Sequence, residues 1–308
     1  MLSALPGTLD AMSRAVVLGG GGPVGIGWEA GLLVGLAESG VDISVADSVI
    51  GTSAGSVVGF TLASGGDLTS ATALVAEANE GQGQQGPEDA AAAAASLEQL
   101  MSTVAEAATN PERAEEVRAR LGRVAVESPT IGEQDWLQMF ATFADASWPD
   151  GFVCTAVGTA DGRFRLWDAT AGIDVQHAVA SSCAVPGIFP PVTIGGTRWM
   201  DGGVRDMLNA DAAAGHDTVL VVSCTLLEIP AELSTPALEA LFGSTRAQLD
   251  GLRRSGCSVE TVVPGQEMLE ISGWGLNLMD FTAAAAAYDA GVRQGKEEAA
   301  RLGGFWNR

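Results

Sequence analysis

Short apolar runs alternate with helical segments along the first part of the chain. The run at residues 15–18 is followed by a glycine-rich turn, then by apolar side chains at helical spacing over about 26–39. A second predicted strand, 45–50, ends in the apolar run Val49-Ile50 and leads into another turn and a helical segment that extends to about residue 63. Continuous short apolar runs are typical of strands buried on both faces. This order predicts a parallel sheet covered by helices.

The middle of the chain has a different composition. Residues 69–143 are rich in alanine and have helical spacing, interrupted by a glycine- and glutamine-rich segment at 81–87 that has little to bury and predicts a mobile loop. We expect a helical insertion beside or over a functional site. It would be either a cap over an apolar pocket or a structural layer of helices.

Strand and helix patterns return in the second half. They predict strands at 151–157, 163–167, 219–223 and 261–263, and helices at 175–182, 236–255 and 277–302. With the first part, they indicate a single α/β domain over residues 1–308 that includes the insertion.

The charge of the chain is strongly acidic. It has 38 Asp and Glu against 16 Lys and Arg, a formal net charge of −22. Such a surface repels nucleic-acid phosphates, so we expect no nucleic-acid partner. It also repels anionic lipid headgroups, so any membrane or micelle contact would be transient, local and apolar.

Targeting and metal-binding signals are missing from the pattern. No basic segment followed by a long apolar one opens the sequence, and no 18-residue apolar stretch predicts a membrane span, so we expect a soluble cytoplasmic protein. Four scattered cysteines lack metal-type spacing, so we expect no metal site; three of them lie in settings typical of buried free thiols. The pattern leaves the oligomeric state open.

The sequence Gly51-x-Ser53-x-Gly55 follows the second apolar run directly. Glycines on both sides let a strand and a helix approach closely, and this arrangement raises a serine to the tip of a sharp turn. The following helix would direct its N-terminal amides at an anion forming above Ser53. The motif therefore predicts a nucleophilic serine, with an ordinary strand-to-helix turn as the structural alternative.

Only two histidines are available to accept a proton from this serine. His216 precedes the predicted strand at 219–223, and strand starts lie at the edge opposite to the usual sites of such sheets. His177 lies within an apolar helical segment, where a packing role is expected. A Ser–His–Asp triad is therefore poorly supported.

A carboxylate is the better candidate base. Asp201 ends a short apolar stretch and is followed by Gly202 and Gly203, which permit close approach of the backbone. A partly desolvated carboxylate beside a serine hydroxyl can accept its proton. Asp-Gly is also a common turn pair, so capping of a turn is the alternative.

The glycine-rich turn at 20–25 offers donors for a developing oxyanion. Pro23 has no N–H, so Gly21 and Gly22 are the expected donors, with the amide of Ala54 beside the nucleophile as a third. The same turn matches Gly-x-Gly-x-x-Gly, and Asp42 lies at a suitable distance for a ribose hydroxyl. A dinucleotide-binding protein is therefore a competing hypothesis, although it explains neither Ser53 nor Asp201.

In combination, these motifs resemble the patatin-like phospholipase family. The likeness covers about residues 15–63 and 152–223. It rests on four elements in order: Gly20-Gly21-Gly22-x-x-Gly25, Gly51-x-Ser53-x-Gly55, the stretch from Ala180 to Pro191, and Asp201-Gly202-Gly203.

The resemblance implies a three-layer α/β/α fold with a mainly parallel central sheet. It also implies a lipid acyl hydrolase that works through a Ser–Asp dyad and an acyl-enzyme, without metal or organic cofactor. By position, Ser53 is the nucleophile, Asp201 the base, and the amides of Gly21 and Gly22 form the oxyanion hole. A catalytically silent binding protein of the same fold is the remaining alternative.

One position departs from the family pattern. The family's glycine loop usually carries Arg or Lys before its last glycine, and here that residue is Val24. The missing cation weakens the expectation of an anionic headgroup near the loop. It favours a neutral ester or a lysolipid, whose chain length and headgroup the sequence does not specify.

Overall fold

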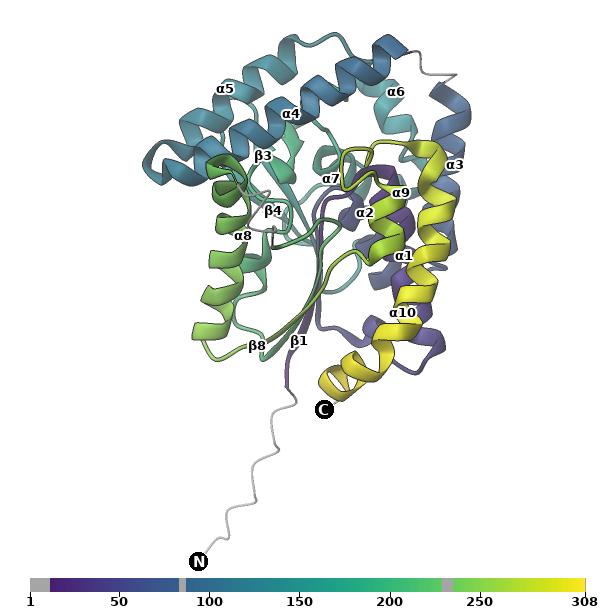
Figure 1. Ribbon diagram of the computed structural model, residues 1–308. Coiled ribbons are helices and arrows are strands. Elements are labelled where there is room, and N and C mark those ends of the chain that lie inside the picture. The colour runs from purple at the N-terminus through teal and green to yellow at the C-terminus, as the bar shows by residue number, and fades with distance from the viewer. Residues whose placement is uncertain (1–11, 83–86, 229–234, 308) are drawn as a thin grey trace, which may run out of the picture.

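A central sheet divides the molecule into layers (Figure 1). The computed structural model describes residues 12–82, 87–228 and 235–307. The sheet has the order β5-β6-β3-β2-β1-β7-β8, with β4 paired to β3. The strands are β1 (Arg14–Leu18), β2 (Ser48–Gly51), β3 (Phe152–Gly158), β4 (Phe164–Trp167), β5 (Val192–Ile194), β6 (Thr197–Asp201), β7 (Thr218–Val222) and β8 (Ser258–Val262).

The centre of the sheet is parallel and one side is antiparallel. Strand β1 pairs in parallel with β2 on one side and with β7 on the other. Strands β2 and β3 are also parallel, and so are β7 and β8. Strands β4 and β6 pair antiparallel with β3, and β5 with β6. The predicted mainly parallel sheet is confirmed, and the antiparallel side was not foreseen.

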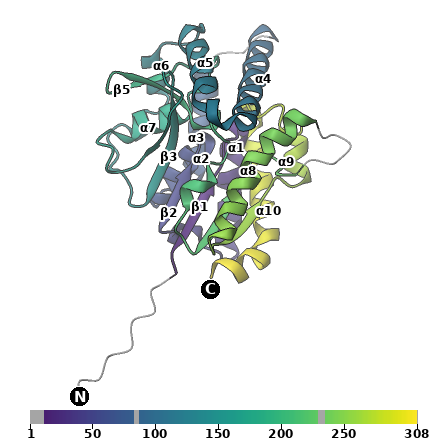
Figure 2. The same cartoon turned by 90° about the vertical axis from the view of Figure 1, so that its left-hand side faces the viewer.

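Helices cover both faces of the sheet, with α8 on one face and α1 and α10 on the other (Figures 1 and 2). Helices α4 and α5 lie across the edge at which β1 ends, and they come from the segment predicted to be an insertion. The helices are α1 (Gly22–Glu38), α2 (Ala54–Ala63), α3 (Thr69–Gln82), α4 (Pro87–Thr109), α5 (Ala114–Glu127), α6 (Glu133–Gln138), α7 (Val175–Ser182), α8 (Pro236–Arg254), α9 (Gln266–Ile271) and α10 (Ala284–Trp306).

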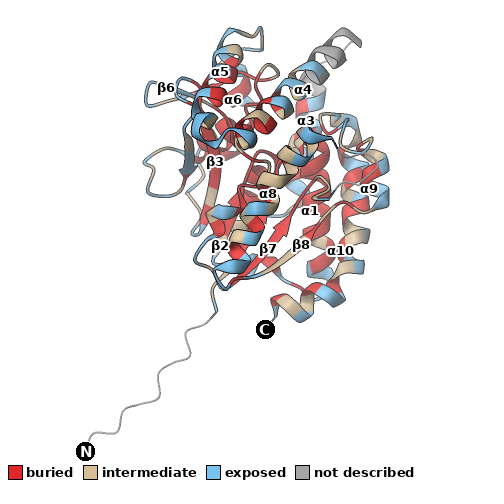
Figure 3. Cartoon of the chain, turned by 60° about the vertical axis from the view of Figure 1, so that its left-hand side comes forward, coloured by how far each residue is buried: buried red, intermediate tan, exposed pale blue. Residues whose placement is uncertain are grey.

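The side chains of β1 point alternately into two apolar cores, one on each face of the sheet. Val16 and Leu18 belong to the core formed with α1 and α10, whereas Ala15 and Val17 pack with Leu249 of α8. Because side chains of a strand point alternately to the two faces, both faces of β1 are apolar and both need a helical cover. Burial is concentrated in the strands and the inner sides of the helices (Figure 3), so the three-layer α/β/α fold is confirmed.

Several predicted boundaries differ from those observed. Helix α1 begins at Gly22 rather than near residue 26, because Pro23 fits the first turn of a helix. The helix predicted from 277 begins at Ala284, after a short 3-10 turn capped by Asp280. Of the loop expected at 81–87, residues 83–86 lie outside the described part. The description of 69–143 as one insertion stays a prediction.

Helices α1 and α10 pack backbone against backbone. A Cβ added to Gly31 would lie 2.1 Å from the carbonyl oxygen of Tyr288, and one added to Gly291 would lie 2.3 Å from that of Trp28. Both distances are far below van der Waals contact. Small residues are therefore required on both helices.

We expect Gly31→Ala to destabilise the protein despite the higher helix propensity of alanine. Propensity contributes about 1 kcal/mol in favour of alanine, whereas overpacking costs about 1–3 kcal/mol. The matched control is Gly251→Ala in α8, where the added Cβ has its nearest neighbour at 3.9 Å. Urea unfolding should show a lower free energy of unfolding for Gly31→Ala. For Gly251→Ala the free energy of unfolding should be unchanged or higher, by up to about 1 kcal/mol. Equal losses in the two variants would contradict this packing.

Candidate active site

Ser53 occupies the turn between β2 and α2 in a strained conformation. Its φ of 52° and ψ of −116° lie in a region that residues other than glycine rarely adopt. A Cβ on Gly55 would lie 2.1 Å from the carbonyl oxygen of Leu18, so β1 and the start of α2 can approach only because this residue is glycine. The amide of Gly55 donates to the carbonyl of Gly19 at 3.0 Å. The turn is thus held against the glycine loop.

Asp201 reaches this serine from the antiparallel side of the sheet. It ends β6 opposite Ala156 of β3, the strand that lies next to β2. The Gly203 amide donates to Asp201 Oδ1 at 2.7 Å. The Asp201 side chain is almost completely buried, with 2% exposure.

The environment of Asp201 favours its neutral form at low pH. Burial raises the pKa of Asp201 to about 7, against hydrogen bonds from the Ser53 hydroxyl and the Gly203 amide that lower it. The sequence placed Ser53 and Asp201 in one site, and the structure brings their side chains together. A carboxylate with this pKa can exchange a proton near neutral pH.

The glycine loop lies beside Ser53 and presents its amides to the site. The Gly20 amide donates to the carbonyl of Met207 at 2.8 Å, so it is occupied. Within the described part of the chain, the amides of Gly21, Gly22 and Ala54 donate to no protein acceptor. Two of them begin α1 and α2, whose N-terminal ends carry partial positive charge. These three amides are suited to an anion.

A buried carboxyl group supports the glycine loop from behind. Glu29 of α1 is fully buried, and its Oε1 accepts the Gly19 amide at 2.9 Å. Among the described residues, its Oε2 has no hydrogen-bond partner. Burial raises the pKa of Glu29 well above its ordinary value, against hydrogen bonds with the Gly19 amide and the Cys224 side chain that lower it. Sequence reasoning gave this residue no role.

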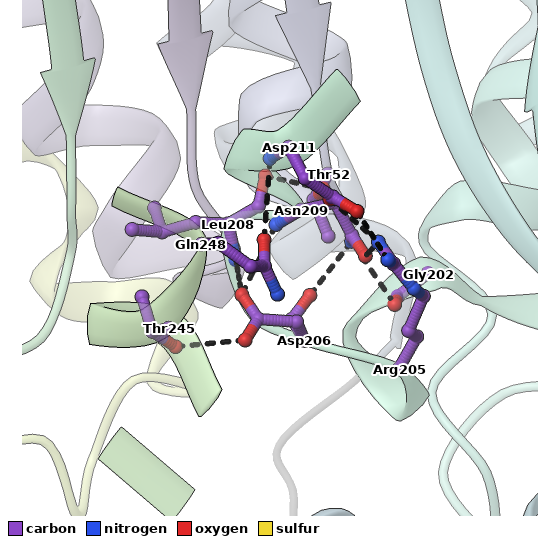
Figure 4. Close-up of polar contacts among 9 residues, drawn as sticks. All are labelled: Thr52, Gly202, Arg205, Asp206, Leu208, Asn209, Asp211, Thr245 and Gln248. Atoms are coloured by element: carbon purple, nitrogen blue, oxygen red, sulfur yellow. Dashed lines mark hydrogen bonds and ion pairs between the residues drawn. The ribbon is translucent and has the colours of Figure 1, made fainter. Parts of the chain in front are cut away.

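A buried polar network connects the two halves of the site (Figure 4). Asn209 Nδ2 donates to Thr52 Oγ1 at 3.1 Å and to the carbonyl of Gly202 at 3.2 Å. Its backbone is left-handed, with φ of 51°, and its amide donates to Asp206 Oδ1. Asn209 therefore joins the residue before Ser53 to the residue after Asp201.

Two further contacts to the serine were also missed from the sequence. The Ser53 amide donates to Ser182 Oγ at 3.0 Å, and the thiol of Cys183 donates to the Ser53 carbonyl at 3.3 Å. Both residues lie at the end of α7, within the stretch from Ala180 to Pro191. The presence of that motif was the signal, but it does not specify which side chains face the serine.

An apolar cavity of about 50 Å³ opens beside Ser53. Its described lining carries no charged side chain. Val24 is fully buried, so this position of the first turn of α1 faces the core. The lining residues are Gly22, Pro23, Ile26, Ser53, Ala54, Val57, Leu74, Val75, Ala78, Trp136, Met139, Phe140, Cys183, Val185, Phe189, Met279 and Phe281.

The rings of the two histidines form their hydrogen bonds with residues outside the Ser53–Asp201 pair. His177 Nδ1 lies 2.8 Å from Asp174 Oδ1 at the start of α7, and His216 Nδ1 lies 3.0 Å from the carbonyl of Ala213. Across residues 12–82, 87–228 and 235–307, no cluster of three or more metal-binding side chains occurs. In the same ranges no helix combines the length and apolar character that crossing a membrane requires.

Asp42 lies away from the glycine loop. It caps the 3-10 turn Ile43–Val45, which precedes β2, whereas the loop follows the end of β1. Because β1 and β2 are parallel, the two features lie at opposite edges of the sheet. This arrangement does not match the dinucleotide site considered above, in which both would contact one ligand.

A family model agrees with the motifs. The family model described as patatin-like phospholipase matches residues 16–214. None of the curated proteins matches significantly. Among solved structures, VipD from Legionella pneumophila is similar with a TM-score of 0.44 and 14% identity over 94% of this chain and 67% of that one. The type III effector protein ExoU has a TM-score of 0.37 and 17% identity over 92% of this chain, which spans 53% of ExoU.

Proposed function

We propose that this chain, because it belongs to the patatin-like phospholipase family, hydrolyses acyl esters of lipids through Ser53 and Asp201. The observation that carries the proposal is the contact of a strained serine with a buried carboxyl group, beside three backbone amides that have no acceptor among the described residues. Activated nucleophile, base and oxyanion donors are the three groups that ester hydrolysis requires.

The reaction proceeds in two steps. Ser53 Oγ attacks the ester carbonyl while the Asp201 carboxylate accepts its proton, and the amides of Gly21, Gly22 and Ala54 bind the oxyanion. Asp201 returns the proton to the departing alcohol as the acyl-enzyme forms. Water then attacks the acyl group, giving its proton to Asp201, which passes it to Ser53 Oγ as the fatty acid is released.

The substrate we favour is a neutral ester or a lysolipid. The described walls of the cavity are apolar, which suits an acyl chain. Val24 supplies no cation beside the glycine loop, and the whole chain carries a net charge of −22. An anionic headgroup would therefore find little compensation there.

Labelling with a fluorophosphonate probe tests the proposal. We expect a covalent adduct on Ser53, located by peptide mass spectrometry, because the probe reacts with activated serines. Ser64→Ala, which removes the hydroxyl of an exposed serine just after α2, should leave labelling unchanged. An unlabelled wild-type protein would favour the silent binding protein, and thermal stabilisation by NAD in that case would favour the dinucleotide hypothesis.

The pKa of Asp201 predicts the pH dependence of the reaction. The base must be ionised, so kcat/KM on a soluble ester should rise with pH and level off above about 7. The stability of the fold should change with pH in the opposite direction. The pKa of Asp201 is higher in the folded chain, about 7, than in the unfolded chain, near 3.8. Its contribution to stability is therefore complete below pH 3.8 and is lost as the pH rises through about 7. A profile that is flat between pH 5 and 8 would contradict the assignment.

A further inference from the structure

The loop between α9 and the 3-10 turn Phe281–Ala283 exposes two large apolar side chains. Trp274 is 63% exposed and Leu276 is 79% exposed, the highest values among the exposed large apolar residues of the described chain. We call Trp274 and Leu276 the apolar tip. Single exposed apolar residues are common on protein surfaces, but two so close together on one loop indicate an interaction site.

The loop is ordered by its own hydrogen bonds. The Trp274 amide donates to the carbonyl of Leu269 at 2.7 Å, and the Asn277 amide donates to the carbonyl of Ser272 at 2.8 Å. Trp274 has a φ of 60°, in the left-handed region that is unfavourable for a bulky side chain. The fold therefore holds the indole outward at a cost in backbone strain.

The apolar tip lies close in sequence to residues that line the cavity beside Ser53. Met279 and Phe281, a few residues farther along the same segment, line that cavity. Between them and the tip, the carbonyl of Leu278 accepts the Val24 amide at 3.3 Å. The loop thus contacts the start of α1 directly, and in Figure 1 it lies between α9 and α10.

The charge around the tip limits its partner. Glu270 and Asp280 are exposed on either side of it, and the chain has a net charge of −22. Anionic lipid would be repelled, whereas an indole and a leucine side chain partition favourably into an electroneutral lipid–water interface.

We propose that the apolar tip inserts Trp274 and Leu276 into the surface of zwitterionic lipid. A lipid whose acyl chain leaves that surface then meets Met279 and Phe281 before it reaches Ser53. This inference rests on the proposed function, because it supplies the route by which the substrate enters the site.

Flotation with phosphatidylcholine vesicles tests the tip. The variant Trp274→Asn with Leu276→Ser removes both apolar side chains, and asparagine tolerates a left-handed backbone, so the fold should be retained, as thermal unfolding will check. We expect its vesicle partition coefficient to fall at least about tenfold. Val45→Ser is the control, since Val45 is 51% exposed but precedes β2 at the opposite edge of the sheet.

The possible outcomes test the lipid-binding role of the apolar tip separately from the proposed hydrolase activity. Replacing part of the phosphatidylcholine by anionic phosphatidylglycerol should weaken the binding of the wild-type protein to the vesicles. No binding by the wild-type protein, equal binding by the double variant, or a changed oligomeric state without a changed partition would overturn the proposal. A labelled Ser53 with any of these results would leave the proposed hydrolase intact, and an unlabelled Ser53 with tip-dependent flotation would reject the hydrolase alone.

Discussion

Replacement of Ser53 by alanine is expected to abolish enzymatic turnover of p-nitrophenyl esters, apart from a small residual rate supported by the remaining oxyanion donors. The hydroxyl is the proposed nucleophile, and no other group can form the acyl-enzyme once it is removed. Alanine must adopt the same positive φ as serine, so the folded backbone should be preserved at a similar cost. The measurement is kcat/KM of the purified variant on a soluble ester.

A second serine in the same site provides the control for Ser53→Ala. Ser182 accepts the Ser53 amide, so Ser182→Ala should disturb the position of the turn while the nucleophile remains. We expect a partial loss of rate for this variant, in contrast to near-complete loss for the first. Retained turnover by purified Ser53→Ala would refute the mechanism.

Substitution of Asp201 by asparagine should lower kcat at least ~10²-fold, the usual effect of removing a general base. Asparagine has nearly the same shape and its oxygen can still accept the Gly203 amide, so the turn after β6 should persist. It cannot accept a proton from Ser53. The remaining rate should therefore lose the rise near pH 7, which a pH series of the variant will show.

One carboxylate outside the site and one histidine serve as controls for this experiment. Asp161→Asn, at an exposed position, should leave the rate unchanged. His177→Ala should also have little effect, because the imidazole bonds with Asp174. A near-wild-type rate for Asp201→Asn would place the base elsewhere, and His177 would then be the first residue to test.

The parallel centre of the fold could be predicted because its strands are short and continuously apolar. The runs that became β1 and β7 are five residues long and rich in valine, which favours strands buried on both faces over helices. The antiparallel side of the sheet is harder to predict from the sequence. Strand β5 has only three residues, and β6 pairs with β3, a strand distant in sequence, which periodicity does not specify. That pairing is what carries Asp201 toward Ser53.

The residues that form hydrogen bonds to the serine turn could not be predicted from the sequence pattern. Asn209 and Ser182 contact the serine turn from segments more than 125 positions away, at distances known only once the sheet is assembled. The start of α10 was also misplaced, since Asn277 to Phe281 have helical composition but form the loop that meets α1. Local propensity was outweighed there by tertiary contacts.

The backbone-to-backbone packing of α1 and α10 has a consequence for shortening the chain. The match to the family ends at residue 214, yet α10 lies at 284–306 and covers the helix whose first turn faces the cavity. Met279 and Phe281, part of the cavity wall, lie beyond residue 214 as well. A fragment cut at the family boundary would therefore expose one side of α1 to water and lose part of the cavity wall. The smallest unit that can be expressed as a complete site extends through the final helix.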